Sequence, residues 1–216
     1  MKPIPENHCQ FYIVRHGQTV WNSEHRMQGQ KDSELTELGV KQARELGEQL
    51  KDVKFAATFS SDLQRAKKTA RLVTMQKQAA ITATKLLRER GMGVLEGKVI
   101  DDLSDELREL LYKVDSHQHY QELEDYQIES LEQALGRIIQ FLRQTALAYP
   151  NHRVLLVTHA GLIGHLLVKL AYLGASHFRH LKIDNLSYVI LNSDGIELEI
   201  VDAKGISLRN QENLLI

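Results

Sequence analysis

The chain has 216 residues, enough to bury a hydrophobic core without disulfide bonds or a structural metal. Its formal net charge of −1 gives no reason to expect a nucleic acid or an anionic membrane surface as a partner. Cys9 is the single cysteine, which excludes an intramolecular disulfide bond, and no apolar stretch is long enough to cross a bilayer. These features predict a cytoplasmic globular protein.

The first strand of the chain leads into the segment with the most distinctive chemistry. Residues 1–9 hold two of the three prolines and little apolar surface, so we expect a loose leader there. The apolar run at about 10–15 is typical of a buried strand, and it ends at Arg15-His16-Gly17. Ligands of an open parallel sheet bind beyond the carboxyl ends of the strands, so Arg15 and His16 are predicted to lie at a site.

A helix and a second strand follow a polar loop. Apolar residues recur at helical spacing from Thr36, a residue type that favours helix N-caps, to about Asp52. Residues 55–60 have the pattern of a second strand. A strand followed by a helix and another strand favours a parallel sheet.

The second strand runs directly into a further helix, for which Ser61 or Asp62 is the predicted N-cap. Arg65 falls near the first turn of this helix, where free backbone amides favour anions. A weakly patterned strand is expected at 80–87, followed by a glycine-rich loop that contains Glu89.

Residues 98–125 interrupt the alternation of strands and helices. They hold nine acidic residues and three basic ones, and we expect them to be helical. We predict that this insert folds over the site as a lid, with a solvated surface helix as the alternative.

The last third of the chain supplies the clearest elements. Ser130 and Gln133 form a capping-box pattern that opens a helix, and residues 153–158 read as a strand that delivers His159. An apolar helix is expected at 162–173, in which His165 is predicted to be a hydrogen-bonded core or boundary residue.

Two strands at 186–191 and 196–201 flank Ser193-Asp194-Gly195, which is a hairpin signal. The sequence therefore predicts a three-layer α/β sandwich with a mostly parallel sheet, at least one antiparallel strand and helices on both faces. We expect a single domain at 10–206 and a tail at 207–216.

Strand ends and their following loops would bring a small group of side chains together: Arg15, His16, Arg65 and His159, with Asn22 and Glu89 nearby. Two arginines repel a cation, so this set is a poor metal site and a good phosphate site. A histidine can attack phosphorus, and a glutamic acid can protonate a leaving oxygen. The set predicts a histidine-nucleophile phosphoryl transfer that needs no metal.

Five motifs occur in order along residues 10–201: Val14-Arg15-His16-Gly17-Gln18-Thr19-x-x-Asn22; Asp32-x-x-Leu35-Thr36-x-x-Gly39; Ser60-Ser61-Asp62-Leu63-x-Arg65-Ala66; Leu87-x-Glu89-x-x-x-Gly93-x-x-Glu96-Gly97; and Val157-Thr158-His159-Ala160-Gly161. In order and spacing, these motifs resemble the histidine phosphatase superfamily, in the branch that includes cofactor-dependent phosphoglycerate mutases.

The resemblance implies a role for each matching residue. His16 would be the nucleophile that becomes phosphohistidine, and Glu89 the proton donor. The phosphate pocket would be completed by Arg15, Arg65 and His159, with Asn22 in contact with the phosphoryl group. The substrate would also touch Gln28 and Gly29.

Two enzyme activities remain open within this family, hydrolysis and mutase transfer. Family mutases hold a second anionic group with basic residues from the insert, including a neighbouring arginine pair, and residues 98–125 lack such a pair. Because acidic residues outnumber basic ones in this segment, we expect it to repel a second anionic group if it faces the site. We therefore expect a metal-independent phosphomonoesterase, without a cofactor, that acts on a small phosphorylated metabolite. The alternatives are a phosphoglycerate mutase and a non-catalytic binder of a phospho-ligand or phosphoprotein.

Overall fold

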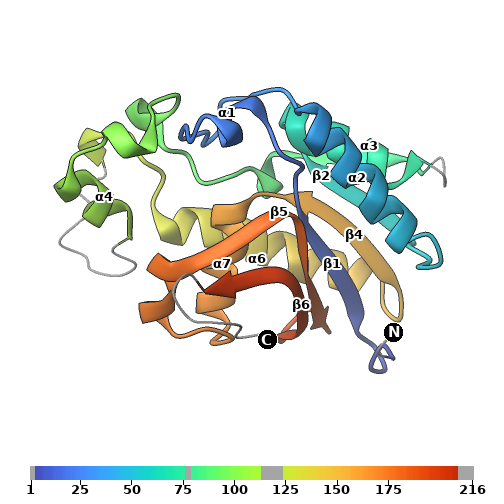
Figure 1. Ribbon diagram of the computed structural model, residues 1–216. Helices are drawn as coiled ribbons and strands as arrows, with labels where there is room; N and C mark the ends of the chain where they lie inside the picture. Colours follow the sequence, from blue (N-terminus) through green and yellow to red (C-terminus); the bar gives the residue numbers. More distant parts are fainter. Residues whose placement is uncertain (1–2, 76–78, 113–123, 209–216) are drawn as a thin grey trace.

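In the computed structural model, which describes residues 3–75, 79–112 and 124–208, six strands form one sheet in the order β3-β2-β4-β1-β5-β6 (Figure 1). In chain order, the strands are β1 (Cys9–Arg15), β2 (Ala57–Ser61), β3 (Ile81–Thr84), β4 (Arg153–Thr158), β5 (Leu181–Ser193) and β6 (Leu198–Leu208).

The four strands β1 to β4 run parallel, and β5 runs antiparallel to both of its neighbours. The mostly parallel sheet with an antiparallel strand is thereby confirmed. The predicted hairpin is also present, since β5 and β6 pair from Ser193 with Leu198 onward. Because β1 to β4 are parallel, their carboxyl ends meet at one edge of the sheet, which is where the predicted site residues follow them.

Helices cover both faces of the sheet, which confirms the three layers. On one face lie α2 (Glu37–Gln49) and α3 (Gln64–Val73), and on the other lie α6 (Leu131–Ala148) and α7 (Ala160–Lys169) (Figure 1). The side chains of β1 alternate between these layers, because successive residues of a strand point to opposite faces. Phe11 and Ile13 pack with α6 and α7, and Tyr12 packs with α2 and α3.

Shorter helical segments among the described residues include α1 (Val20–Ser23), α4 (Asp105–Tyr112) and the 3₁₀ segments Lys85–Leu87, Gly93–Leu95, Ile100–Asp102 and Ala175–His180. The strand expected at 80–87 therefore ends at Thr84 and continues as a 3₁₀ turn. The helix expected at 162–173 begins two residues earlier and ends at Lys169. Among the residues that the structure describes, no helix is long and apolar enough to span a membrane.

Two of the predicted caps are present. The hydroxyl of Thr36 accepts a hydrogen bond from the amide of Gly39 at 3.0 Å and caps α2. Ser130 and Gln133 form the reciprocal capping box of α6.

The predicted cap of α3 is wrong, because both candidate side chains have other partners. The carboxylate of Asp62 binds Arg88 through both oxygens, at 2.6 and 2.7 Å, and the hydroxyl of Ser61 accepts from the amide of Leu63. The cap comes from Asp32 in the loop after β1, whose carboxylate accepts from the amides of Gln64 at 2.6 Å and Arg65 at 3.2 Å.

Part of the predicted insert and tail lies outside the described residues. Within the insert at 98–125, the 3₁₀ segment and α4 are described, and residues 113–123 are not. Of the tail expected at 207–216, the first two residues belong to β6, and residues 209–216 fall outside the described ranges.

Candidate active site

A cavity of about 330 Å³ opens at the carboxyl edge of the parallel strands. It is lined by seven of the eight residues expected to form the site, namely Arg15, His16, Asn22, Gln28, Gly29, Arg65 and Glu89. The eighth, His159, is fully buried beside it, with its ring centroid 5.2 Å from that of His16.

His16 is held in the tautomer that a nucleophile requires. It follows β1 directly, and its amide donates to the carbonyl of Thr158 at 3.0 Å. Its ring Nδ1 lies 2.8 Å from the carbonyl oxygen of Gly17. Because a carbonyl oxygen only accepts, Nδ1 carries the hydrogen, and the lone pair resides on Nε2. Burial, together with the positive charges of Arg65 and Arg15, holds the pKa of His16 well below its usual value, so the ring is neutral.

Arg65, on α3, binds the loop after β1 through its side chain. The side chain is 1% exposed, and its guanidinium donates at 2.6 Å to the carbonyls of both Gly29 and Lys31. It also pairs with Asp32 at 3.2 Å. Its Nε is buried and has no hydrogen-bond partner among the described residues. One N–H of this anchored guanidinium therefore stays available for an oxyanion.

Arg15 is arranged in a similar way. One guanidinium nitrogen donates to the carbonyl of Ile183, and its Nε is buried without a partner in the described part of the chain. Burial lowers the pKa of Arg15 to about 10, which still leaves the side chain positively charged near pH 7. Arg15 and Arg65 thus each offer a desolvated N–H, and such charge-assisted bonds suit phosphate oxygens.

His159 stands at the N-cap position of α7, directly after β4. Burial and the positive charge of Arg65 hold its pKa well below the usual value. Neither ring nitrogen has a hydrogen-bond partner among the described residues. Buried polar atoms without partners are uncommon in native proteins, so their concentration around His16 indicates a place for a polar ligand.

The carboxylate of Glu89 lies at the N-terminal end of α7 and accepts hydrogen bonds from three backbone amides. Oε2 accepts from Gly161 at 2.9 Å, and Oε1 accepts from Leu162 at 3.0 Å and Arg90 at 2.9 Å. A Cβ on residue 161 would lie 2.8 Å from Oε1, so a glycine is required for this close approach.

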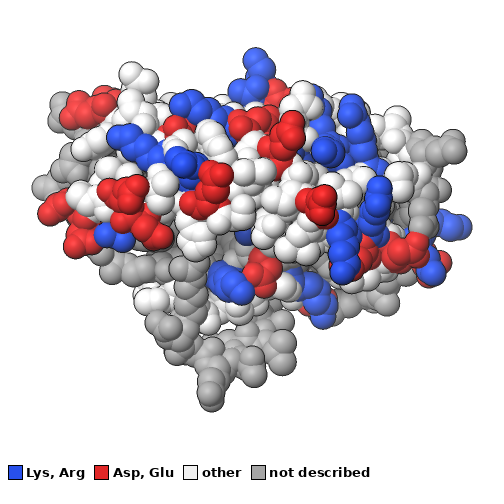
Figure 2. All heavy atoms as spheres, turned by 45° about the horizontal axis from the view of Figure 1, so that its top comes forward, with Lys and Arg blue, Asp and Glu red and all other residues white. Residues whose placement is uncertain are grey.

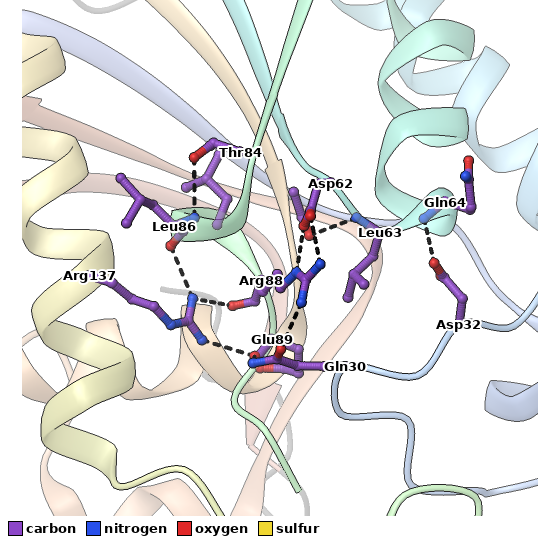
Figure 3. A network of polar contacts seen from close by, with 12 residues as sticks. Gln30, Asp32, Asp62, Leu63, Gln64, Thr84, Leu86, Arg88, Glu89 and Arg137 are labelled. Atoms are coloured by element: carbon purple, nitrogen blue, oxygen red, sulfur yellow. Dashed lines mark hydrogen bonds and ion pairs between the residues drawn. The ribbon is translucent and has the colours of Figure 1, made fainter. Parts of the chain in front are cut away.

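The backbone of Glu89 is fixed by a residue that the sequence did not point to, Arg137 on α6. Figure 3 shows its guanidinium reaching the carbonyls of Leu86, Arg88 and Glu89, the last at 2.9 Å. Glu129 binds the same guanidinium at 2.8 and 3.0 Å. An arginine on an amphipathic helix carries no local signal for this role, because its partners lie about 50 residues away in the chain.

The three residues expected to touch the substrate contribute different groups. The side-chain oxygen of Asn22 accepts from Asn185 at 3.3 Å and from the amide of Thr19 at 3.2 Å, which leaves its amide nitrogen as a donor. Gln28 has a buried side-chain oxygen without a partner among the described residues. Gly29 contributes its carbonyl to Arg65 and adopts a positive φ of 52°.

The charge of the insert facing the cavity differs from its overall charge. From the described part of 98–125, only Ile100 and Arg108 line the cavity. The acidic residues Asp101, Asp102, Asp105 and Glu106 are exposed. Figure 2 shows acidic side chains gathered over the end of the molecule that holds α4. The expectation that this segment repels a second anionic group is therefore not supported. Counting all walls, five arginines line the cavity: Arg15, Arg26, Arg65, Arg90 and Arg108.

The interpretation of His165 as a hydrogen-bonded core residue is wrong for one of its nitrogens. The residue lines the cavity from α7, and its Nδ1 is buried without a partner in the described structure. Its position four residues after Gly161 is the sequence signal that could have placed it on the cavity face of α7.

In the described part of the chain, no group of three or more histidine, cysteine, aspartate or glutamate side chains could hold a metal ion.

Comparison with known proteins shows the family of the chain. Residues 11–204 match the histidine phosphatase superfamily (branch 1). The chain is 35% identical over 181 residues to a probable phosphoglycerate mutase, GpmB, of Erwinia tasmaniensis, a match that covers 82% of both chains.

Two solved structures extend the likeness. A phosphoglycerate mutase from Bacillus anthracis is 30% identical with a TM-score of 0.78, covering 93% of this chain and 94% of the other. A mycobacterial glucosyl-3-phosphoglycerate phosphatase is 27% identical with a TM-score of 0.75, covering 92% of this chain and 99% of the other. The chain belongs to branch 1 of the histidine phosphatase superfamily.

Proposed function

We propose that the protein is a metal-independent phosphomonoesterase that acts through a phosphohistidine intermediate on a small phosphorylated metabolite. The hydrogen bond from Nδ1 of His16 to the carbonyl of Gly17 is the observation that carries this proposal. It leaves Nε2 with its lone pair beside two arginines, each with an unpartnered N–H among the described residues.

In the first step, Nε2 of His16 attacks phosphorus while the bond between phosphorus and the leaving oxygen breaks. Glu89 donates a proton to that oxygen, and the alcohol departs. Oε2 of Glu89 accepts one backbone hydrogen bond and Oε1 accepts two, so Oε2 is the oxygen with room to carry the proton. Arg15 and Arg65 bind the oxygens of the transferring group, where negative charge is concentrated.

In the second step, water attacks phosphorus and the bond to Nε2 breaks. The Glu89 carboxylate accepts the proton from the water, inorganic phosphate leaves, and His16 returns to its neutral form. His159 would donate a hydrogen bond to a phosphoryl oxygen, a role supported by its neutral ring and its position next to His16.

The experiment is hydrolysis of an aryl phosphate in EDTA, with chemical analysis of the trapped intermediate. The wild type should release phosphate without added metal and carry acid-labile, alkali-stable phosphate. His16→Ala should carry none, and turnover should fall at least about 10⁴-fold. The control is His152→Ala, which replaces an exposed histidine and should behave as wild type. Labelling that persists in His16→Ala would refute the nucleophile, and an inactive, unlabelled wild type across a broad phosphoester panel would favour a non-catalytic binder.

Mutase transfer is the second candidate, and the charged wall of the cavity favours it. Arg26, Arg90 and Arg108 line the cavity in addition to Arg15 and Arg65, and they could hold a second anionic group of the substrate. The names of the relatives from Erwinia tasmaniensis and Bacillus anthracis also support it. The fate of the phosphoryl group on phosphorylated wild-type protein separates the two activities: release as inorganic phosphate supports hydrolysis, and transfer to added phosphoglycerate supports the mutase.

A further inference from the structure

His165 occupies the wall of the cavity one helical turn beyond the anchor of Glu89. Gly161, whose amide binds the Glu89 carboxylate, and His165 both line the cavity. Residues four apart lie on the same helix face, separated by about 6 Å along the axis. Since Glu89 meets the leaving oxygen in the proposed reaction, His165 lies at the position of the carbon skeleton beyond that oxygen.

The imidazole of His165 is held by packing, and its Nδ1 has no hydrogen-bond partner among the described residues. It is 5% exposed and stacks on Phe178, with ring centroids 4.2 Å apart and an angle of 18° between the planes. Its Nδ1 is buried and makes no hydrogen bond within the described structure. Burial and the charge of Arg90 lower the pKa of His165 to about 3, so the ring is neutral.

The surrounding wall combines apolar surface with polar groups, among them the side chains of Gln28, Arg90 and Arg108. Met27, Met92, Ile100 and Phe178 line the same cavity, and they suit a short carbon skeleton. The side-chain oxygen of Gln28 is also buried without a partner among the described residues, and it can only accept a hydrogen bond. A hydroxyl group both donates and accepts, so it can satisfy this oxygen or either tautomer of the imidazole.

We propose that His165 is a specificity-determining residue that hydrogen-bonds an uncharged hydroxyl group on the alcohol part of the substrate. The preferred substrates are then phosphorylated polyols, and simple alkyl phosphates are poor ones. This inference rests on the proposed function, since it takes the phosphate to be bound at His16. A site built to hydrogen-bond a hydroxyl discriminates strongly against the analogue that lacks it, because its buried polar atoms are then left unpaired.

A matched pair of substrates tests this role: glycerol 1-phosphate and n-propyl phosphate. The wild type should prefer glycerol 1-phosphate in kcat/KM by at least about tenfold. His165→Leu should reduce that ratio to within about twofold, because leucine offers no hydrogen bond. His165→Asn should keep a preference of several-fold, since its amide can place a polar atom near the position of Nδ1. His180→Leu, at an exposed histidine of the following 3₁₀ segment, is the control and should keep the full ratio.

An unchanged ratio in His165→Leu, or a wild type without the preference, would overturn the inference. If the wild type hydrolyses neither ester, the broad phosphoester panel decides the proposed function, and calorimetric dissociation constants for the same two esters decide the role of His165. At least about tenfold tighter wild-type binding of glycerol 1-phosphate, lost in His165→Leu, supports it. Equal dissociation constants contradict it.

Discussion

The floor of the cavity and its rim are built in different ways. We call His16, Arg65 and His159 the floor: they follow the ends of parallel strands and are 3%, 1% and 0% exposed. The rim consists of Arg26 and Arg108, which come from the loop after β1 and from α4, with side chains 38% and 39% exposed. The floor is therefore desolvated and fixed by the sheet, and the rim is solvated and carried by connecting segments.

This difference suggests a division of roles in which the floor carries out the reaction and the rim selects the substrate. Charges in a desolvated floor interact strongly with a phosphoryl group, whereas charges at a solvated rim are screened. Connecting segments also tolerate sequence change better than the sheet that positions them. Under the proposed function, the floor would keep one reaction while the rim and the wall around His165 adapt to the part of the substrate that varies.

Replacing Arg65 by lysine should have the largest effect, because it removes the fork that joins the floor to the loop after β1. A lysine cannot bind both carbonyls of Gly29 and Lys31 and a phosphate oxygen as well. We expect kcat/KM to fall about 10³-fold and stability to fall by about 2 kcal/mol. Steady-state kinetics and urea denaturation measure both, with the exposed Arg71→Lys on the same helix as a control. Wild-type kinetics in the Arg65 variant would show that the floor does not depend on this fork.

Glu89→Gln should separate leaving-group chemistry from phosphate binding. An amide cannot donate the proton as a carboxylic acid does, so kcat for an alkyl phosphate should fall by about 10²-fold or more. For an aryl phosphate with a good leaving group, the loss should be below about tenfold, because protonation matters less. The comparison of the two substrates is the measurement. Equal losses for both would mean that Glu89 only caps α7.

Lowering the pH should reveal the cost of keeping neutral histidines buried. The folded-state pKa of His165 is about 3, so between the unfolded value near 6.5 and that pKa only the unfolded chain binds this proton. Stability is therefore lost as pH falls through this window, by about 1.4 kcal/mol per pH unit for this residue. Between pH 7 and pH 5, His165→Leu should lose about 2 kcal/mol less stability than wild type in urea denaturation. The exposed His152→Leu should follow the wild-type slope, and the same slope in His165→Leu would contradict a buried neutral ring.

Arg137→Lys should have the smallest effect, because Arg137 acts only through the backbone of Glu89. An ammonium group cannot satisfy three carbonyls and Glu129 together, so Glu89 should be held less well. We expect kcat for alkyl phosphates to fall about tenfold, with KM within about twofold and a smaller loss for aryl phosphates. Arg143→Lys, exposed on the same helix, is the control. Lower stability with unchanged kcat would show that Arg137 is only structural.

The sequence predicted elements whose signals are local. The sandwich, the hairpin and the caps by Thr36 and Ser130 follow from periodicity and from side chains within four residues of their partners. The convergence of the strand ends follows from parallel topology. These features need no knowledge of which distant side chains meet.

The predictions that failed depend on features that are not local in the sequence. The cap of α3 comes from Asp32, about 30 residues earlier, because Asp62 is occupied by Arg88. The net charge of 98–125 gave the wrong sign for the side chain that lines the cavity, because a sum over a segment does not say which residue faces inward. The role proposed for His165 depends on its stacking with Phe178 and on a buried Nδ1 without a hydrogen-bond partner among the described residues, and periodicity reveals neither.

The carboxylate of Asp32 has a consequence for how the pocket opens. It accepts hydrogen bonds from two amides of α3 and from the guanidinium of Arg65, and so joins the loop after β1 to a helix that packs on the sheet. An N-cap of this kind contributes about 1 kcal/mol. Local opening of the loop should also uncap the helix, so we expect both to exchange as one cooperative unit in native-state hydrogen exchange. The proposed phosphate pocket would then be preorganised by folding, and substrate binding would not have to supply the ordering free energy of that loop.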